Sequence, residues 1–103
     1  MQAEQSIDMT AEINEKKRRY GRACEQIALL DRKIADLEKR YKRAKRDKMR
    51  PFQYNINLRL QVLHGVRTMY SNYASNKAAE LRSDLMAVLL QMIPGLDSNT
   101  SSE

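Results

Sequence analysis

Apolar residues recur every seven positions along the first half of this chain, in two interleaved series. The resulting steps of three and four residues place both series on one stripe of a helix. The members of this stripe are Met9, Ile13, Tyr20, Ala23, Ile27, Leu30, Ile34, Leu37, Tyr41 and Ala44. A stripe of this length predicts a long helix that hides one side against a second helix.

The composition argues against a fold with many strands and reversals. The chain of 103 residues contains 3 Gly, 2 Pro and no Trp, and 31% of its residues are charged. Turn residues are too few for a multistranded sheet, and apolar residues are too few for a thick globular core. We therefore expect an all-α protein, an antiparallel helical hairpin of the coiled-coil type.

A proline divides the helical pattern into two parts. Pro51 lacks a backbone donor and disfavours the helical conformation of Arg50, so the chain is predicted to reverse there. Apolar residues at helical spacing then continue as far as Ile93. The predicted segments are a flexible leader at 1–7, one domain at 8–93 (helix 8–49, turn 50–56, helix 57–93) and a disordered polar tail at 94–103.

A reversal at Arg50 and Pro51 brings together residues whose numbers add up to 100 or 101. In this register apolar residues of the two helices match, and Lys16, a charged member of the first stripe, lies near Asp84. The predicted helix–helix interface consists of Ile13, Tyr20, Ile27, Leu30, Ile34, Leu37, Tyr41, Leu60, Leu63, Val66, Tyr70, Leu81, Leu85 and Val88.

Several apolar residues lie outside this predicted interface and would be exposed to solvent unless a further helix buries them. They are Leu29, Tyr73, Met86, Leu89, Leu90 and Ile93. Since each helix of a hairpin has only one partner helix, we expect these residues to be buried by a second copy or by another helical protein, in a helical bundle.

A second interpretation of the region after the proline is a strand over residues 54–62, because apolar and polar residues alternate there. A strand at this place, followed by two helices around a polar turn at 71–76, resembles the ribbon-helix-helix family of DNA-binding domains. The resemblance implies a DNA-binding regulator that reads bases with the outward residues of the strand. Here these residues would be Asn55, Asn57 and Arg59.

Residues for catalysis are scarce in this sequence. His64 is the one histidine and Cys24 the one cysteine, and no serine has a base placed to activate it. The sequence contains neither a glycine-rich phosphate loop nor a ligand set for zinc or calcium. We expect a non-enzymatic interaction or scaffold protein with no cofactor, no metal and no small-molecule substrate.

The first helix becomes strongly basic where its apolar stripe ends. Residues 39–50 carry eight cationic side chains against one acidic one, whereas the formal net charge of the whole chain is +6. This is more charge than the carboxyl end of a helix dipole requires, so we expect the segment to bind nucleic acid, an acidic protein surface or an anionic membrane. Its cationic residues are Lys39, Arg40, Lys42, Arg43, Lys45, Arg46, Lys48 and Arg50.

The location of the protein is predicted from the same features. The single cysteine and the polar leader indicate a soluble intracellular protein, and the basic clusters at 16–19 and 42–45 favour the nucleus over the cytoplasm. The most apolar run, residues 85–93, is much shorter than the ~20 residues that span a bilayer. We therefore expect no integral membrane insertion.

Overall fold

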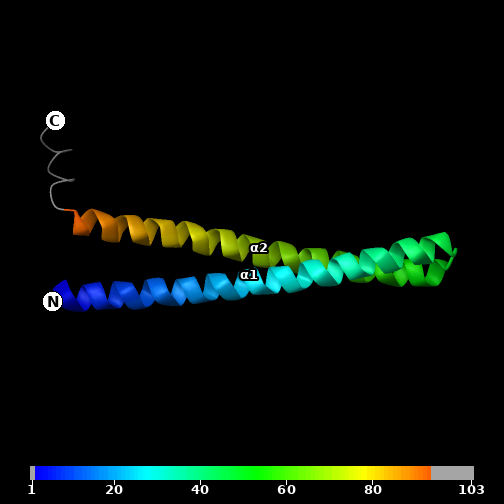
Figure 1. Ribbon diagram of the computed structural model, residues 1–103, viewed down its shortest axis with the longest axis horizontal. Coiled ribbons are helices and arrows are strands. Elements are labelled where there is room, and N and C mark those ends of the chain that lie inside the picture. Colours follow the sequence, from blue (N-terminus) through cyan, green and yellow to red (C-terminus); the bar gives the residue numbers. More distant parts are fainter. Residues whose placement is uncertain (1, 94–103) are drawn as a thin grey trace, which may run out of the picture. The chain divides into compact units, whose positions relative to one another are not determined.

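The predicted all-α helical hairpin is confirmed by a computed structural model, which describes residues 2–93, with side chains from Met9 onward. Helix α1 covers Gln2–Arg46 and helix α2 covers Arg50–Met92. A turn of three residues joins them, and no strand is present within residues 2–93. Figure 1 shows that α1 runs toward this turn and that α2 runs back from it, antiparallel to α1.

The hairpin consists of two compact units, and each contains a part of both helices. Unit 1 combines the described residues up to Tyr20 with those from Ser75 onward, and unit 2 is Gly21–Ala74, which includes the turn. The core of unit 2 is formed by Ile34, Leu37 and Leu60. Tyr41, Ile56 and Leu63 pack against it from both helices. The heptad stripe of the first helix therefore does form a helix–helix interface in this unit.

The turn is built by a backbone motif at the end of α1. Lys48 adopts a left-handed conformation with φ of 58°. Its N–H donates to the carbonyl of Lys45 at 3.2 Å, and the N–H of Met49 donates to the carbonyl of Ala44 at 2.9 Å. These two bonds are those of a Schellman motif, in which one left-handed residue ends the helix. The chain thus reverses at residues 47–49, three residues before the predicted point.

Lys48 occupies a position that normally favours glycine. A side chain in the left-handed region costs about 1 kcal/mol because its Cβ approaches the following carbonyl. Lys48→Gly is therefore expected to raise the stability of unit 2 by about 1 kcal/mol, seen as a higher midpoint of thermal unfolding by circular dichroism. Lys48→Ala removes the same charge but keeps the strain, so it serves as the control. Equal midpoints for the two variants would contradict this explanation.

Helix α2 begins at Arg50, so the prediction of a turn over 50–56 and a helix only from 57 is wrong. The N–H of Gln53 donates to the carbonyl of Met49 at 3.0 Å, which makes Met49 the residue that caps α2. Pro51 lies in the first turn, where backbone N–H groups have no acceptor within the helix, so its missing donor costs nothing. The side chain of Gln53 also donates to the carbonyl of Ala44 at 3.2 Å and links α2 to the end of α1.

The strand predicted as an alternative over residues 54–62 is also wrong, because this segment is helical. A strand would turn Tyr54, Leu58 and Leu60 to the same side. The structure instead buries Leu60 and exposes Tyr54 and Leu58. Packing against α1 selects the helical period, since Ile56, Leu60 and Leu63 follow each other at steps of four and three.

The outer ends of the predicted segments are tested only in part. Helix α1 begins at Gln2, so residues 2–7 are helical and do not form the predicted leader. Helix α2 ends at Met92, and the N–H of Ile93 still donates to the carbonyl of Leu89 at 3.1 Å. The predicted tail at 94–103 lies outside the described residues.

The register of the two helices differs from the predicted one by about one helical turn. In unit 2, the pairs Ala44 with Gln53 and Asp31 with Arg67 have numbers that add up to 97 and 98. In unit 1, Lys16 lies between Glu80 and Asp84, which gives the same register. The sum of paired residue numbers predicted from the sequence is 100 or 101. The difference follows from the turn, because sums near 97 are centred on Lys48 and Met49, not on Pro51.

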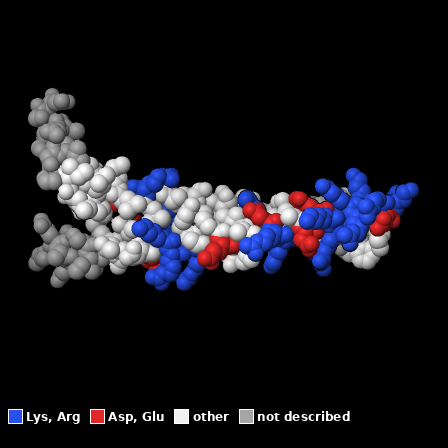
Figure 2. Space-filling view, in the orientation of Figure 1, with Lys and Arg blue, Asp and Glu red and all other residues white. Residues whose placement is uncertain are grey.

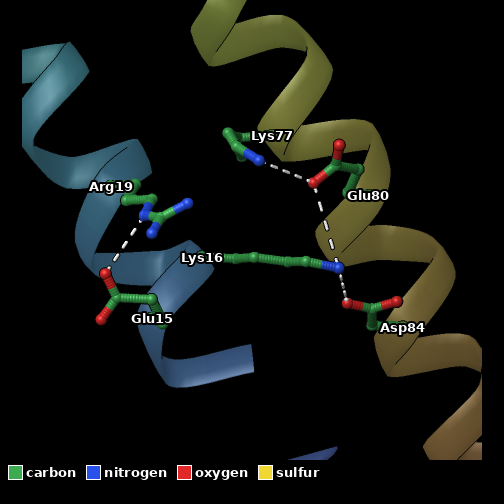
Figure 3. A network of polar contacts seen from close by, with 6 residues as sticks. All are labelled: Glu15, Lys16, Arg19, Lys77, Glu80 and Asp84. Atoms are coloured by element: carbon green, nitrogen blue, oxygen red, sulfur yellow. Dashed lines mark hydrogen bonds and ion pairs between the residues drawn. The ribbon is translucent and has the colours of Figure 1, made fainter. Parts of the chain in front are cut away.

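The predicted pairing of Lys16 with Asp84 is present in unit 1 despite this shift. The Nζ atom of Lys16 donates to Oδ2 of Asp84 at 2.6 Å and lies 3.9 Å from Oε2 of Glu80, which also accepts from Lys77 (Figure 3). The hydrogen bond to Asp84 raises the pKa of Lys16 above its ordinary value. A charged residue in the apolar stripe of α1 is thereby neutralised by α2.

The residues of the predicted interface differ in how deeply they are buried. Five of them are buried: Ile13, Leu30, Ile34, Leu37 and Leu60. Six are half-buried: Ile27, Tyr41, Leu63, Val66, Leu81 and Val88. Tyr20 and Tyr70 are just over a third exposed, and Leu85 is 46% exposed. The prediction that Leu85 belongs to the interface is wrong. The register places Asp84, and not Leu85, toward α1.

Candidate anion-binding site at the turn

Eight cationic side chains lie around the turn of unit 2, and all of them are exposed. Six belong to the last two turns of α1, one to the turn itself and one to the first residue of α2. Figure 2 shows Lys and Arg side chains gathered at this end of unit 2. They are Lys39, Arg40, Lys42, Arg43, Lys45, Arg46, Lys48 and Arg50.

Only two of these eight residues make an ion pair within the described part of the chain. Arg40 lies 3.2 Å from Asp36, one turn earlier on α1, and Arg46 lies 3.7 Å from its neighbour Asp47. Exposed pairs of this kind contribute little to stability, with about 0 to 1 kcal/mol each. The other six side chains present their charges to solvent.

Helix α2 supplies no carboxylate that could neutralise them. Residues 48–79 contain neither Asp nor Glu, so every acidic residue of unit 2 lies on α1 or in the turn. Unit 2 carries 13 basic and 5 acidic residues, a formal charge of +8, whereas the remainder of the chain carries 6 and 8, a charge of −2. The positive charge of the protein therefore belongs to unit 2.

The helix dipole explains a part of this arrangement. Arg43, Lys45 and Arg46 are in the last turn of α1, where cations stabilise the carboxyl end of a helix. The dipole acts only within that turn, so it gives no reason for the cations one turn earlier or for Arg50 at the start of α2. An amino terminus of a helix favours anions, and the first turn of α2 has no acidic residue.

The spacing of the cations is interrupted by the turn. A single helical face through Lys39, Arg43, Arg46 and Arg50 requires α1 to continue to residue 50. Since α1 ends at Arg46, this face stops there and Arg50 belongs to the other helix. The cations therefore surround the end of a hairpin, and do not form a stripe along one helix.

A second set of ionic contacts in unit 2 lies away from the turn and stabilises the helix pair. Arg67 of α2 donates from Nε and Nη2 to the two carboxylate oxygens of Asp31 on α1. The Arg67 hydrogen bond lowers the pKa of Asp31 below its usual value of 3.8. Any stability from this pair is present above that pH and is lost as the pH falls through the lowered pKa. The pair of Asp31 with Arg67 is not among the contacts predicted from the sequence.

Two large apolar residues beside the cations were also missed. Met49 is 43% exposed and Phe52 is 56% exposed, and they flank Arg50 and Pro51 at the turn. The sequence gives one signal for them, since residues at a chain reversal have no second helix on their outer side. Their exposure means that the end of unit 2 is both cationic and apolar.

The residues suggested for reading DNA bases do not lie on a strand. Asn55, Asn57 and Arg59 are exposed on α2. Steps of two residues on a helix are about 200° apart, so Asn57 points away from the side shared by the other two. The ribbon-helix-helix arrangement, which needs all three on one face of a strand, is therefore absent.

Other kinds of site find no support in the described residues. Between residues 9 and 93, no three His, Cys, Asp or Glu side chains lie close enough to hold a metal ion. Neither described helix has an apolar stretch long enough to cross a membrane. Comparison with protein-family models, curated proteins and solved structures finds no match for this chain.

Proposed function

We propose that this protein is a non-enzymatic helical interaction protein, whose turn in unit 2 binds an acidic surface. The observation that carries the proposal is the group of six exposed cations at this turn without an ion-pair partner among the described residues. Like charges held this close destabilise a fold unless something external compensates them. An acidic partner supplies that compensation.

The composition of α2 supports the same conclusion. A surface charge that served only solubility would be mixed with acidic residues, as it is on the earlier turns of α1. Near the turn, the partner helix instead lacks carboxylates from residue 48 to 79. Nucleic acids, acidic proteins and anionic membrane leaflets all carry the complementary charge and are all present inside cells, which is where we place the protein.

A second interaction is proposed for unit 1, through its exposed apolar residues. Among the described residues of unit 1, only Ile13 is buried. The last turns of α2 expose Leu85, Met86, Leu89, Leu90 and Met92, and Ile93 directly after the helix is exposed as well. An apolar cluster of this extent is typical of a helix that packs into a larger bundle, with a second copy or another helical protein as its partner.

The proposal is tested by measuring how DNA affinity depends on salt. A labelled duplex of arbitrary sequence serves as the polyanion, and its fluorescence anisotropy reports binding. We expect the logarithm of the association constant to fall linearly with the logarithm of the salt concentration, with a slope of about −5 if all six unpaired cations contact phosphates. Light scattering on the same samples gives the stoichiometry. Absence of binding to DNA, to heparin and to anionic lipid vesicles at low salt would contradict the proposal.

A further inference from the structure

The turn of unit 2 combines two features that different partners would use. Cations alone are sufficient for nucleic acid or for an acidic protein. The turn also exposes Met49 and Phe52. Met49 lies between Lys48 and Arg50 in the chain, and Phe52 follows two residues after Arg50. The acidic partner that binds cations and large apolar side chains at the same place is the surface of a lipid bilayer.

The hairpin itself leaves about half of the surface of Met49 and Phe52 exposed. The core of unit 2 comprises Ile34, Leu37 and Leu60, and the residues that pack on it nearest the turn are Tyr41 and Ile56. Met49 and Phe52 lie beyond that level, in the turn and in the first turn of α2. Exposing them costs free energy in water, and nothing in the helix pair requires a large apolar residue at either position.

The backbone at the turn fixes where the two side chains lie. Met49 is held by two hydrogen bonds, from its N–H to Ala44 and from the N–H of Gln53 to its carbonyl. Phe52 lies in the first turn of α2, next to Pro51, whose φ is fixed by its ring. The apolar residues are therefore presented by a rigid reversal, and little conformational entropy is lost when they enter another phase.

Nucleic acid is the less suitable partner for this combination. Single strands stack their bases on aromatic rings, so Phe52 alone could serve them. Met49 has no flat ring to stack on a base, and the grooves of a duplex offer it only occasional apolar contacts. The interfacial region of a bilayer accepts aromatic and thioether side chains alike, while long cationic side chains remain with the phosphates.

We propose that the turn of unit 2 docks on anionic lipid bilayers, with Met49 and Phe52 entering the boundary of the acyl chains. Lys45, Arg46, Lys48 and Arg50 then contact the headgroup phosphates around them. This proposal rests on the proposed function, since it names the acidic surface that the turn binds. Binding is peripheral and reversible, because two apolar side chains and a ring of cations fall far short of a spanning helix.

The first experiment uses the absence of tryptophan from the chain. Phe52→Trp introduces one indole whose emission reports the polarity at the turn. Phosphatidylcholine vesicles that contain phosphatidylserine are expected to shift this emission to the blue, whereas heparin and duplex DNA leave it unchanged. A shift with phosphatidylserine vesicles that is absent with pure phosphatidylcholine supports the proposal. Binding to the vesicles without a shift would overturn it.

The second experiment separates the apolar residues from the charges. The double variant Met49→Ser, Phe52→Ser keeps every charge and is expected to lower sedimentation with phosphatidylserine vesicles about tenfold, while its affinity for heparin stays within about twofold. The control is Leu58→Ser, Val62→Ser, which removes two exposed apolar residues of α2 away from the turn. It should retain vesicle binding. Circular dichroism verifies that both variants are helical.

The outcomes distinguish this inference from the function on which it rests. Binding to heparin and DNA without binding to vesicles would leave the proposed function intact and make nucleic acid or an acidic protein the partner. Equal vesicle binding by wild type and Met49→Ser, Phe52→Ser would overturn the apolar contact. Loss of vesicle binding in the control variant as well would show that general hydrophobicity is responsible, and this too would overturn it. No binding to any polyanion would overturn both.

Discussion

Ile34→Asp is expected to unfold unit 2. Ile34 is 7% exposed and belongs to the core with Leu37 and Leu60. The substitution removes apolar contacts and places a charged carboxylate in the apolar core, which costs about 3 to 5 kcal/mol. Small domains have a total stability of about 5 to 15 kcal/mol, and a core as narrow as this one is placed at the lower end. We expect most of the helical signal of unit 2 to be lost.

The measurement is urea and thermal unfolding followed by far-ultraviolet circular dichroism. Ala28→Asp is the control, because it introduces the same carboxylate on an exposed position of the same helix. It changes helix propensity by about 0.5 kcal/mol and leaves the core intact. Similar unfolding midpoints for the two variants would mean that Ile34 does not belong to the core.

Reversal of four charges at the turn should abolish polyanion binding. The variant Lys42→Glu, Arg43→Glu, Lys45→Glu, Arg46→Glu changes residues 39–50 from a net charge of +7 to −1, since each reversal removes two units. All four side chains are exposed and none belongs to the apolar stripe, so the hairpin should still form. We expect the affinity for duplex DNA at low salt to fall by at least about 100-fold.

The control for this variant carries the same change of charge elsewhere. Lys17→Glu, Arg22→Glu, Arg32→Glu, Lys33→Glu also lowers the net charge by eight, on exposed positions of α1 that are remote in sequence from the turn. If binding depends on the local charge at the turn, the control loses much less affinity. Equal losses would show that only the total charge matters, and an unchanged affinity in the first variant would exclude the turn as the site.

The sequence alone was sufficient to predict the first helix and the fold class. A heptad pattern of ten residues from Met9 to Ala44 fits only one period, so no alternative structure was available for that segment. Met86, Leu89, Leu90 and Ile93 of unit 1 were predicted to lie outside the interface, and all four are exposed. The concentration of charge in residues 39–50 is a property of composition and needed no structure.

The second helix was ambiguous in sequence, and its packing decided the outcome. Residues 54–62 fit the period of a strand as well as that of a helix. Contacts of Ile56, Leu60 and Leu63 with α1 select the helix. These contacts connect residues far apart in the chain, so the local pattern could not show which period would be stabilised.

The turn and the register were likewise decided by the tertiary structure. The sequence predicts a reversal at Pro51, but a proline is acceptable in the first turn of a helix, and Pro51 lies there. The residue that ends α1 is Lys48, and a lysine gives no sign in the sequence that it will adopt a left-handed conformation. The predicted pair of Lys16 with Asp84 is present although the predicted register differs from the observed one by about one turn. The long flexible side chain of Lys16 reaches more than one position on α2.

The amino-acid order alone shows which residues are apolar and where the positive charge lies, and it predicts that the chain forms a helical hairpin. Only the tertiary structure determined that the reversal is at Lys48, that residues 54–62 are helical and that Met49 and Phe52 are exposed among the cations. The physical reason is that periodicity and charge belong to the local chain. The position of a turn instead depends on the balance between backbone strain at one residue and the packing of two whole helices.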